Sequence, residues 1–352
     1  MSDPAGPGRP PFDLEAALAR VRGRGPALVL MHDNPDPDSM AAAECLRALL
    51  WQEAALPVTV ARGGYIGRPE NRAMVNVLGL SHVSVDRVDF SSYPVIALVD
   101  TQPETGNNSL PAGHRVDIVV DHHPIRPHAG RAPWCDIRED FGASSTITWT
   151  YLRDRKLPID PRLATALLYA IKSETRDLVR EASDHEHDAF SELMKEADFD
   201  KLYAISEPKV PAAHFVVLDR ALRGAEVRGS LLAVNLGELD YPDLVAEIAD
   251  LLLPYEKAHW VLCVGRYRGA VYLSVRSDVA NAHAGDLIRK VVSQKGAAGG
   301  HGVVAGGKLH VPVNNDEELA PLYQELLDRM TALLHIDAKQ STKLLPRPDG
   351  DT

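Results

Sequence analysis

The fold of this chain is decided by the stretch Val-Asp-Ile-Val-Val-Asp-His-His-Pro, residues 116–124. A short β-branched run is typical of a buried strand, and this one stops at a carboxylate and two imidazoles. In sheets of the α/β class, binding sites lie at the carboxyl ends of the strands. The stretch therefore predicts a buried strand that delivers Asp121, His122 and His123 to a site.

Two earlier stretches repeat this pattern of an apolar run that ends in polar side chains. Residues 95–99 lead into Asp100. Residues 27–31 lead into a loop whose candidate site residues are His32, Asn34, Asp36 and Asp38. One such strand end would be read as a solvated turn, but three make coincidence the weaker explanation. Because the runs alternate with helical segments, they predict a doubly wound, mainly parallel α/β sheet with helices on both faces.

The composition indicates a globular protein and limits the partners that it can bind. The 352 residues are enough for two domains, and 45% hydrophobic with 25% charged residues is typical of a globular protein. The formal charge is −11, and no block rich in lysine and arginine is present. An acidic surface repels long polyphosphate backbones, so no long duplex DNA is expected as partner. Small phosphorylated substrates in a local basic pocket remain compatible with this charge.

Cysteine usage and hydropathy bear on the compartment. The three cysteines, Cys45, Cys135 and Cys263, form no C-x-x-C pair, so they predict reduced thiols rather than a disulfide framework or a zinc ribbon. No apolar run approaches the roughly 20 residues that span a bilayer, and the first residues contain no apolar targeting segment. We expect a cytoplasmic protein with no membrane partner.

Two predicted helix starts carry polar groups beside these strand ends. Asp38 and Ser39 are expected to begin a helix, since both residue types are good N-caps. Residues 142–146 are expected to open another helix. The free N–H groups at Ser144 and Ser145 could hold a substrate phosphate, and an ordinary cap is as well supported.

A second domain of a different kind follows the proline-containing segment 207–211 and a connecting helix. Its predicted helices cover residues 241–252, 283–292 and 316–334. Its predicted strands cover residues 227–234, 260–267 and 270–276, with a tight turn at Arg268 and Gly269. The pattern predicts a smaller α+β domain with a smaller, mixed sheet, and an active-site cleft between the two domains.

The glycine-rich stretch 296–308 is the most informative part of this second domain. Gly299 and Gly300 would let the backbone approach a ligand closely while His301 contacts an anion, although a chance histidine in a hairpin loop fits equally well. Arg276 ends the preceding strand and offers a planar fork suited to phosphate. These four residues are candidate substrate-binding residues.

Taken in order, the motifs resemble the DHH phosphoesterase family, which includes RecJ-like exonucleases, inorganic pyrophosphatases, exopolyphosphatases and the nanoRNase/pAp phosphatase group. Residues 32–39, 99–101 and 121–123 resemble its first three motifs, and residues 299–301 with Arg276 resemble the DHH-associated domain. The domains that this resemblance implies are a tail at 1–12, a DHH catalytic domain at 13–205, a connecting helix at 206–225, a DHH-associated substrate-binding domain at 226–336 and a tail at 337–352.

The resemblance implies two Mn²⁺ or Mg²⁺ ions bridged by Asp100. The residues that would hold the first ion are His32, Asp36 and Asp100, and those that would hold the second are Asp38, Asp100, His122 and Glu174. His123 would contact the scissile phosphate or protonate the leaving group, Asp121 would orient an imidazole, and Asn34 is a further catalytic candidate. Glu174 and Pro37 depart from the family, which usually has Asp and often Gly at these places.

The expected function is two-metal-dependent hydrolysis of phosphate esters in short nucleotide substrates, namely nanoRNA, linear dinucleotides, pAp or cyclic dinucleotides. The alternatives are an exopolyphosphatase or pyrophosphatase, and a nucleotide-binding regulatory module with an impaired metal centre, for which Glu174 is the only hint. Tyr241, Tyr267 and Tyr272 could stack on a base, although a core position is the stronger expectation for each. A homodimer is a possible assembly.

Overall fold

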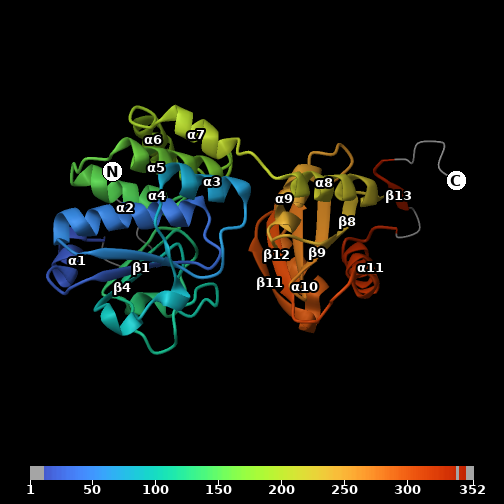
Figure 1. Cartoon of the computed structure of the whole chain (residues 1–352), viewed down its shortest axis with the longest axis horizontal. Coiled ribbons are helices and arrows are strands. Elements are labelled where there is room, and N and C mark those ends of the chain that lie inside the picture. Colours follow the sequence, from blue (N-terminus) through green and yellow to red (C-terminus); the bar gives the residue numbers. More distant parts are fainter. Residues whose placement is uncertain (1–11, 338–340, 346–352) are drawn as a thin grey trace. The chain divides into compact units, whose positions relative to one another are not determined.

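A computed structural model describes residues 12–337 and 341–345. The chain divides into two compact units, the first ending at Pro208 and the second beginning at Lys209 (Figure 1). The segment predicted as a connecting helix, 206–225, thus lies mainly in the second unit. Within the described residues, no helix is both long and apolar enough to cross a lipid bilayer.

The sheet of the first unit is parallel throughout, and its strand order reverses at its centre. Its described strands are β1 (Ala27–Met31), β2 (Val58–Arg62), β3 (Val83–Ser84), β4 (Val95–Val99), β5 (Ile118–Asp121) and β6 (Trp134–Ile137). They lie in the order β3-β2-β1-β4-β5-β6, so the direction of winding changes between β1 and β4. The predicted doubly wound sheet is confirmed. Ligands of such sheets bind outside the carboxyl ends of the strands at this reversal.

Helices of the first unit cover one face of its sheet. They are α1 (Leu14–Val21), α2 (Pro37–Ala54), α3 (Pro69–Leu78), α4 (Ser144–Asp154), α5 (Pro161–Glu174), α6 (Asp184–Leu193) and α7 (Phe199–Ser206). Alternate strand residues such as Val29 and Ala97 pack into their core, and Figure 1 shows α2 lying along β1 and β4.

The opposite face differs from the predicted two-sided helical cover. Leu28 and Leu98 point into a second, smaller core together with Phe90. Short 3-10 turns at 85–87, 90–92 and 129–131 and long loops cover this face. The segment between β4 and β5 is rich in Gly, Pro and Asn, which favour turns over a helix.

Helix α2 begins two residues earlier than predicted. Its N-cap is Asp36, whose Oδ1 accepts the Ser39 N–H at 2.9 Å, while the Ser39 hydroxyl accepts the Asp36 N–H at 3.1 Å. Pro37 occupies the first helical position, where its fixed φ and missing N–H cost nothing. The early start places Asp38 inside the first turn, where it is buried.

The second unit contains a mixed sheet with helices on both faces. Its elements are α8 (Ala212–Gly224), β7 (Glu226–Arg228), β8 (Leu231–Glu238), α9 (Leu244–Leu252), β9 (Trp260–Tyr267), β10 (Ala270–Ser277), α10 (Ala284–Val292), a 3-10 turn at 293–295, β11 (Gly296–His301), β12 (Val304–Leu309), α11 (Asp316–Leu333) and β13 (Ser341–Lys343). The order is β11-β12-β10-β9-β8-β7-β13, in which only β8 and β9 pair in parallel among the described strands. Helices α8 and α9 pack on one face and α10 and α11 on the other.

Three details of this unit differ from the sequence-based expectations. The predicted strand 227–234 is broken at Gly229, which has φ +55°, into β7 and β8. The glycine-rich stretch forms the paired strands β11 and β12, so the sheet has seven described strands and is not smaller than that of the first unit. Part of the predicted C-terminal tail, Ser341–Lys343, pairs with β7 as β13.

Candidate metal centre

Polar side chains from three neighbouring strands meet at the reversal of the first sheet. His32 follows β1, Asp100 follows β4, and His122 and His123 follow β5. These strands are adjacent and parallel, so their carboxyl ends lie at one edge. The site therefore lies where the topology of a doubly wound sheet places ligands.

Asp100 is shared between two groups of potential metal ligands. One group is His32, Asp36 and Asp100, and the other is Asp100, His122 and His123; within each group the ligand atoms lie within 4.8 Å of one another. Asp100 Oδ2 is 3.5 Å from His32 Nε2, whereas Oδ1 is 3.6 Å from both His122 Nε2 and His123 Nδ1. The two carboxylate oxygens thus serve different groups.

The donor set fits divalent cations. The distances of 3.5–3.6 Å around Asp100 are longer than a good hydrogen bond. They are close to the separation of two ligand atoms that share one cation at roughly 2.1 Å each. His32 Nδ1 lies 3.0 Å from the Asp33 carbonyl and His122 Nδ1 lies 3.3 Å from the Phe141 carbonyl, which directs both Nε2 atoms toward Asp100. Carboxylate and imidazole donors without a thiolate suit Mn²⁺ or Mg²⁺.

The acids and imidazoles hold one another in charged forms. Burial by itself would lower the pKa of His32, but Asp36 and Asp100 raise it well above its ordinary value. Burial would raise the pKa of Asp100, but the adjacent imidazole of His32 and the charges of His123 and His122 lower it. A divalent cation would replace the imidazolium protons in this balance, because only neutral imidazole binds metal.

Asp38 is held by the start of α4. Its carboxylate accepts the N–H groups of Ser144 at 2.8 Å and Ser145 at 2.9 Å. Burial, followed by the charges of Asp100 and Asp36, raises the pKa of Asp38 well above its ordinary value. The N–H groups of Ser144 and Ser145, which the sequence offered either to a phosphate or to an ordinary cap, thus both donate to Asp38. The Ser144 hydroxyl donates instead to Asp100 Oδ1 at 2.9 Å.

Glu174 ends α5 and lies near the other carboxylates. Burial and then the charges of Asp36 and Asp38 raise its pKa to about 7, although Arg180 opposes them. Its Oε1 is 2.7 Å from Arg180 Nη2. Glu174 and Asp38, both expected to hold the second cation, belong to neither three-residue group. The second group contains His123 in addition to Asp100 and His122.

His123 is oriented by a chain of hydrogen bonds. Its Nδ1 lies 2.9 Å from Asp121 Oδ1, and Asp121 Oδ2 accepts from Gln102 Nε2 at 2.7 Å. Burial would lower the pKa of His123, but the Asp121 hydrogen bond and the Asp100 charge raise it to about 10. Sequence reasoning missed Gln102, whose place two residues after Asp100 at the same strand end was the available signal.

Asn34 shapes its loop rather than pointing at the two groups. It has φ +58°, and its Oδ1 accepts the Tyr65 N–H at 3.1 Å. A Cβ on Gly64 would lie 2.2 Å from the same oxygen, so the loop closes tightly on this amide. These contacts give Asn34 a structural role and do not support its assignment as a catalytic residue.

The candidate substrate residues of the second unit have mixed positions. Arg276 is buried and donates to Asp250 Oδ1 at 2.6 Å and to the Ser274 hydroxyl at 2.8 Å, so its fork is already engaged. Gly299 pairs with Gly306, and a Cβ on Gly299 would meet nothing within 4 Å. In contrast, a Cβ on Gly300 would lie 2.3 Å from the Val304 carbonyl oxygen. His301 pairs with Val304 through its backbone, and its side chain lies outside the described part of the structure.

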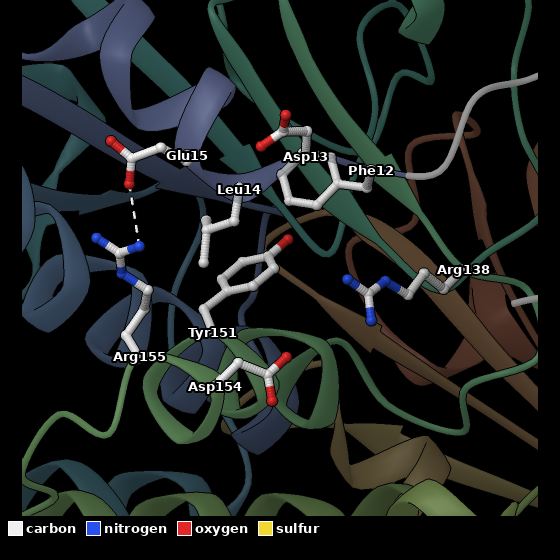
Figure 2. A pocket seen from close by; sticks show the side chains of 8 residues that line it. All are labelled: Phe12, Asp13, Leu14, Glu15, Arg138, Tyr151, Asp154 and Arg155. Carbon is white, nitrogen blue, oxygen red and sulfur yellow. Dashed lines mark ion pairs between the residues drawn. The ribbon is translucent and has the colours of Figure 1, made fainter. Parts of the chain in front are cut away.

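A separate pocket of about 670 Å³ lies between the start of α1 and the end of α4 (Figure 2). Phe12 and Tyr151 line it with their rings, and charged side chains surround them. Arg155 pairs with Glu15 at 3.0 Å across one side. None of the predicted site residues lines this pocket, so it is distinct from the two groups that share Asp100.

Comparisons with known proteins bear on these groups. Residues 26–171 match the family described as "DHH family, N-terminal domain". The "Uncharacterized protein MJ1633" of Methanocaldococcus jannaschii is 30% identical over 326 residues, which is 91% of this chain and 66% of that protein. A "Probable manganese-dependent inorganic pyrophosphatase" of Staphylococcus saprophyticus is 26% identical over 144 residues, which is 41% of this chain and 46% of that protein. The chain thus spans just under two thirds of the first relative and under half of the second.

A solved structure shares the fold. The crystal structure of an exopolyphosphatase-related protein from Bacteroides fragilis has a TM-score of 0.72 and 14% identity, and the match covers 91% of this chain and 98% of that one. The family match at residues 26–171 contains every strand whose carboxyl end supplies the two groups. Residues 26–171 of this chain are thus similar to the N-terminal domain of the DHH family.

Proposed function

We propose that this protein is a two-metal-dependent phosphoesterase that hydrolyses phosphate ester bonds in short nucleotide substrates. The observation that carries the proposal is Asp100, whose two oxygens serve two separate groups of ligands. A shared carboxylate suits a pair of cations about 3.5–4 Å apart, which is the spacing of two-metal phosphoesterase sites. The manganese dependence named for the Staphylococcus saprophyticus relative supports a divalent cation.

The residues that would hold the cations follow from the two groups. His32, Asp36 and Asp100 would hold one, and Asp100 with His122 would hold the other. The further candidates for the second cation are Asp38, Glu174 and His123. When bound, the cations would activate a water molecule and neutralise charge on the phosphoryl oxygens.

His123 is placed to transfer a proton. Asp121 engages its Nδ1, so the other ring nitrogen, Nε2, can carry the proton that a leaving oxygen needs. The side chain is 43% exposed, which leaves it accessible to substrate. Gln102 fixes Asp121 and thereby the orientation of the imidazole.

Features of the second unit support a nucleotide substrate. Tyr272 on β10 is half-buried, and the Lys308 ammonium lies 5.5 Å from its ring centroid. Residues paired across neighbouring strands lie on the same face of a sheet. Gly306 and its partner Gly299 therefore lie on the same face as Tyr272 and Lys308, and they leave that part of the face without side chains. A planar base can lie on such a surface while a lysine binds phosphate. The formal charge of −11 favours short substrates over long nucleic acid.

Hydrolysis of pyrophosphate or polyphosphate is the second candidate. The name of the Staphylococcus saprophyticus relative supports this candidate, but that similarity covers only 41% of this chain. A regulatory module with an impaired centre is less well supported, because each of the two groups brings three carboxylate or imidazole donors together.

Hydrolysis of a small panel tests the proposal. The panel consists of pAp, 5′-pApA, a five-residue RNA, a cyclic dinucleotide, pyrophosphate and polyphosphate, each with Mn²⁺ and with Asp100→Ala as the inactive variant. We expect nucleotide monophosphate from pApA or the short RNA, lost in the variant. Orthophosphate from pyrophosphate or polyphosphate alone would favour the second candidate, and tight nucleotide binding without turnover would favour the regulatory module.

A further inference from the structure

The segment after α5 contains an unusual left-handed turn. Arg176, Asp177 and Leu178 are consecutive and have φ of +49°, +58° and +64°. Residues with a side chain rarely adopt this conformation, so three in a row must be held by their surroundings. Such conformations cluster at functional sites, where neighbouring structure imposes them.

Buried Thr175 holds this turn from one side. Its carbonyl oxygen accepts the N–H groups of Val179 at 3.0 Å and of Arg180 at 2.7 Å. Its hydroxyl oxygen accepts the N–H group of Leu178 at 3.0 Å. The same hydroxyl donates to the backbone carbonyl oxygen of Ile171 in α5 at 2.6 Å. The turn is therefore fastened to the helix that ends in Glu174.

Gly142 bounds the segment from the other side. A Cβ at this position would lie 2.5 Å from the Glu181 carbonyl oxygen, so the two backbones are in close contact. Gly142 stands two residues before α4, whose first N–H groups hold Asp38. The segment thus lies against the part of the site that positions Asp38.

The consequence of the turn is the position of Arg180. Its Nη2 donates to Glu174 Oε1 at 2.7 Å and to the Glu174 carbonyl at 2.5 Å. Both side chains are 22% exposed. The guanidinium therefore lies beside an acidic site formed by Glu174, Asp36, Asp38 and Asp100.

Arg180 retains an unused donor. Its Nε is buried and has no acceptor among the described residues. Buried donors are almost always paired, so one without an acceptor at a ligand site requires an explanation. A guanidinium presents its donors in a planar fork that matches the oxygens of a phosphoryl group.

We propose that Arg180 is a phosphate-binding residue of this site, which holds Glu174 through Nη2 and donates from Nε to a non-bridging oxygen of the scissile phosphoryl group. This inference rests on the proposed function and names a residue that recognises its substrate. A phosphoryl group carries negative charge into a site that is itself acidic. Arg180 offsets that charge at the side where Glu174 lies.

Binding of inorganic phosphate to the Mn²⁺-loaded full-length protein tests the proposal by calorimetry. In Arg180→Lys the charge and the pairing with Glu174 remain but Nε is lost, so we expect phosphate affinity to fall about tenfold or more with Mn²⁺ affinity unchanged. Turnover of a substrate should fall by on the order of 10²-fold. Arg223→Lys is the matched control, because Arg223 forms an exposed ion pair with Asp219 at 2.7 Å.

A second variant keeps the test decisive if lysine is poorly tolerated. In Arg180→Ala, added guanidinium should restore part of the phosphate affinity, which a merely structural role would not allow. Unchanged phosphate affinity in Arg180→Lys, a parallel loss of Mn²⁺ affinity, or no phosphate binding by the unmodified protein would overturn the assignment of Arg180. If the unmodified protein hydrolyses no substrate, the proposed function fails, and the phosphate titration still decides the role of Arg180.

Discussion

At the scale of single residues, the proposed pair of cations depends on Asp100. We expect Asp100→Ala to remove several kcal/mol of transition-state stabilisation, on the order of 10³-fold in kcat/KM, because both ligand groups lose their shared member. Mn²⁺ titration followed by electron paramagnetic resonance should show weaker binding at both sites. Asp154→Asn is the control, since Asp154 is exposed and pairs with Arg153. Normal binding at one site in the Asp100 variant would contradict the shared-ligand arrangement.

Gln102 should affect catalysis without affecting metal content. In Gln102→Met the side chain can no longer donate to Asp121 Oδ2, so the Asp121–His123 pair loses its fixed orientation. We expect kcat to fall about 10- to 100-fold. Mn²⁺ affinity should remain near that of the unmodified protein. An equal loss of both would show that Gln102 supports the metal ligands instead.

Metal uptake should release protons. The pKa of His123 is raised to about 10 and that of His32 is raised well above its ordinary value, so both imidazoles are protonated at neutral pH in the metal-free protein. Mn²⁺ needs them neutral where they serve as ligands, and its affinity should therefore rise with pH, with release of up to about two protons per chain near pH 7. Calorimetry in buffers of different ionisation enthalpy measures this number. A result near zero would mean that neither imidazole is protonated before binding.

The strand-end residues could be predicted because a strand that stops at a ligand residue is a local pattern. Asp100 and His122 were found in this way, each directly after a buried run. Gln102 lies at the same strand end as Asp100 and was missed, whereas Arg180 could not be predicted, because its role depends on contacts that only the folded chain creates. Arg180 reaches Glu174 through three left-handed residues, a conformation that no residue preference predicts.

At the scale of elements, the first turn of α2 combines helix capping with a proposed metal ligand. Asp36 caps the helix through Oδ1 and belongs to the first ligand group. Asp36→Asn should separate these roles, because asparagine caps as well as aspartate but lacks the charge. We expect the melting temperature of the metal-free protein to stay within a few degrees and Mn²⁺ affinity to fall. A large drop in melting temperature would mean that the charge itself stabilises α2.

The strands were easier to predict than the cover of the sheet. The run 27–31 is apolar throughout, the run 260–267 is apolar except at Gly265 and Arg266, and the bounds of both strands in the structure agree with the prediction. The start of α2 was placed two residues late because Pro37 was read as part of a loop, although proline is favoured at the first helical position. The glycine-rich strands β11 and β12 have no strand composition, and pairing with β10 makes them a sheet.

At the scale of the whole molecule, each unit has its own hydrophobic cores, so the two should melt independently. We expect two calorimetric transitions. Mn²⁺ should raise the melting temperature of only one of them, that of the unit ending at Pro208, because binding stabilises the unit that holds the ligands. Limited proteolysis at 207–211, between α7 and α8, should leave two folded fragments. A single transition that shifts as a whole would show that the units fold cooperatively.

The proposed use of Asp36 as both cap and ligand has a consequence for the lifetime of the protein in a cell. A bound cation stabilises the folded chain by mass action, so scarcity of the metal would let the first turn of α2 open more often. Chains that open more often are degraded faster. If the proposed site binds a divalent cation, abundance of this protein should therefore follow the supply of that cation, and starvation for it should lower the amount of the protein as well as any activity that depends on the cation.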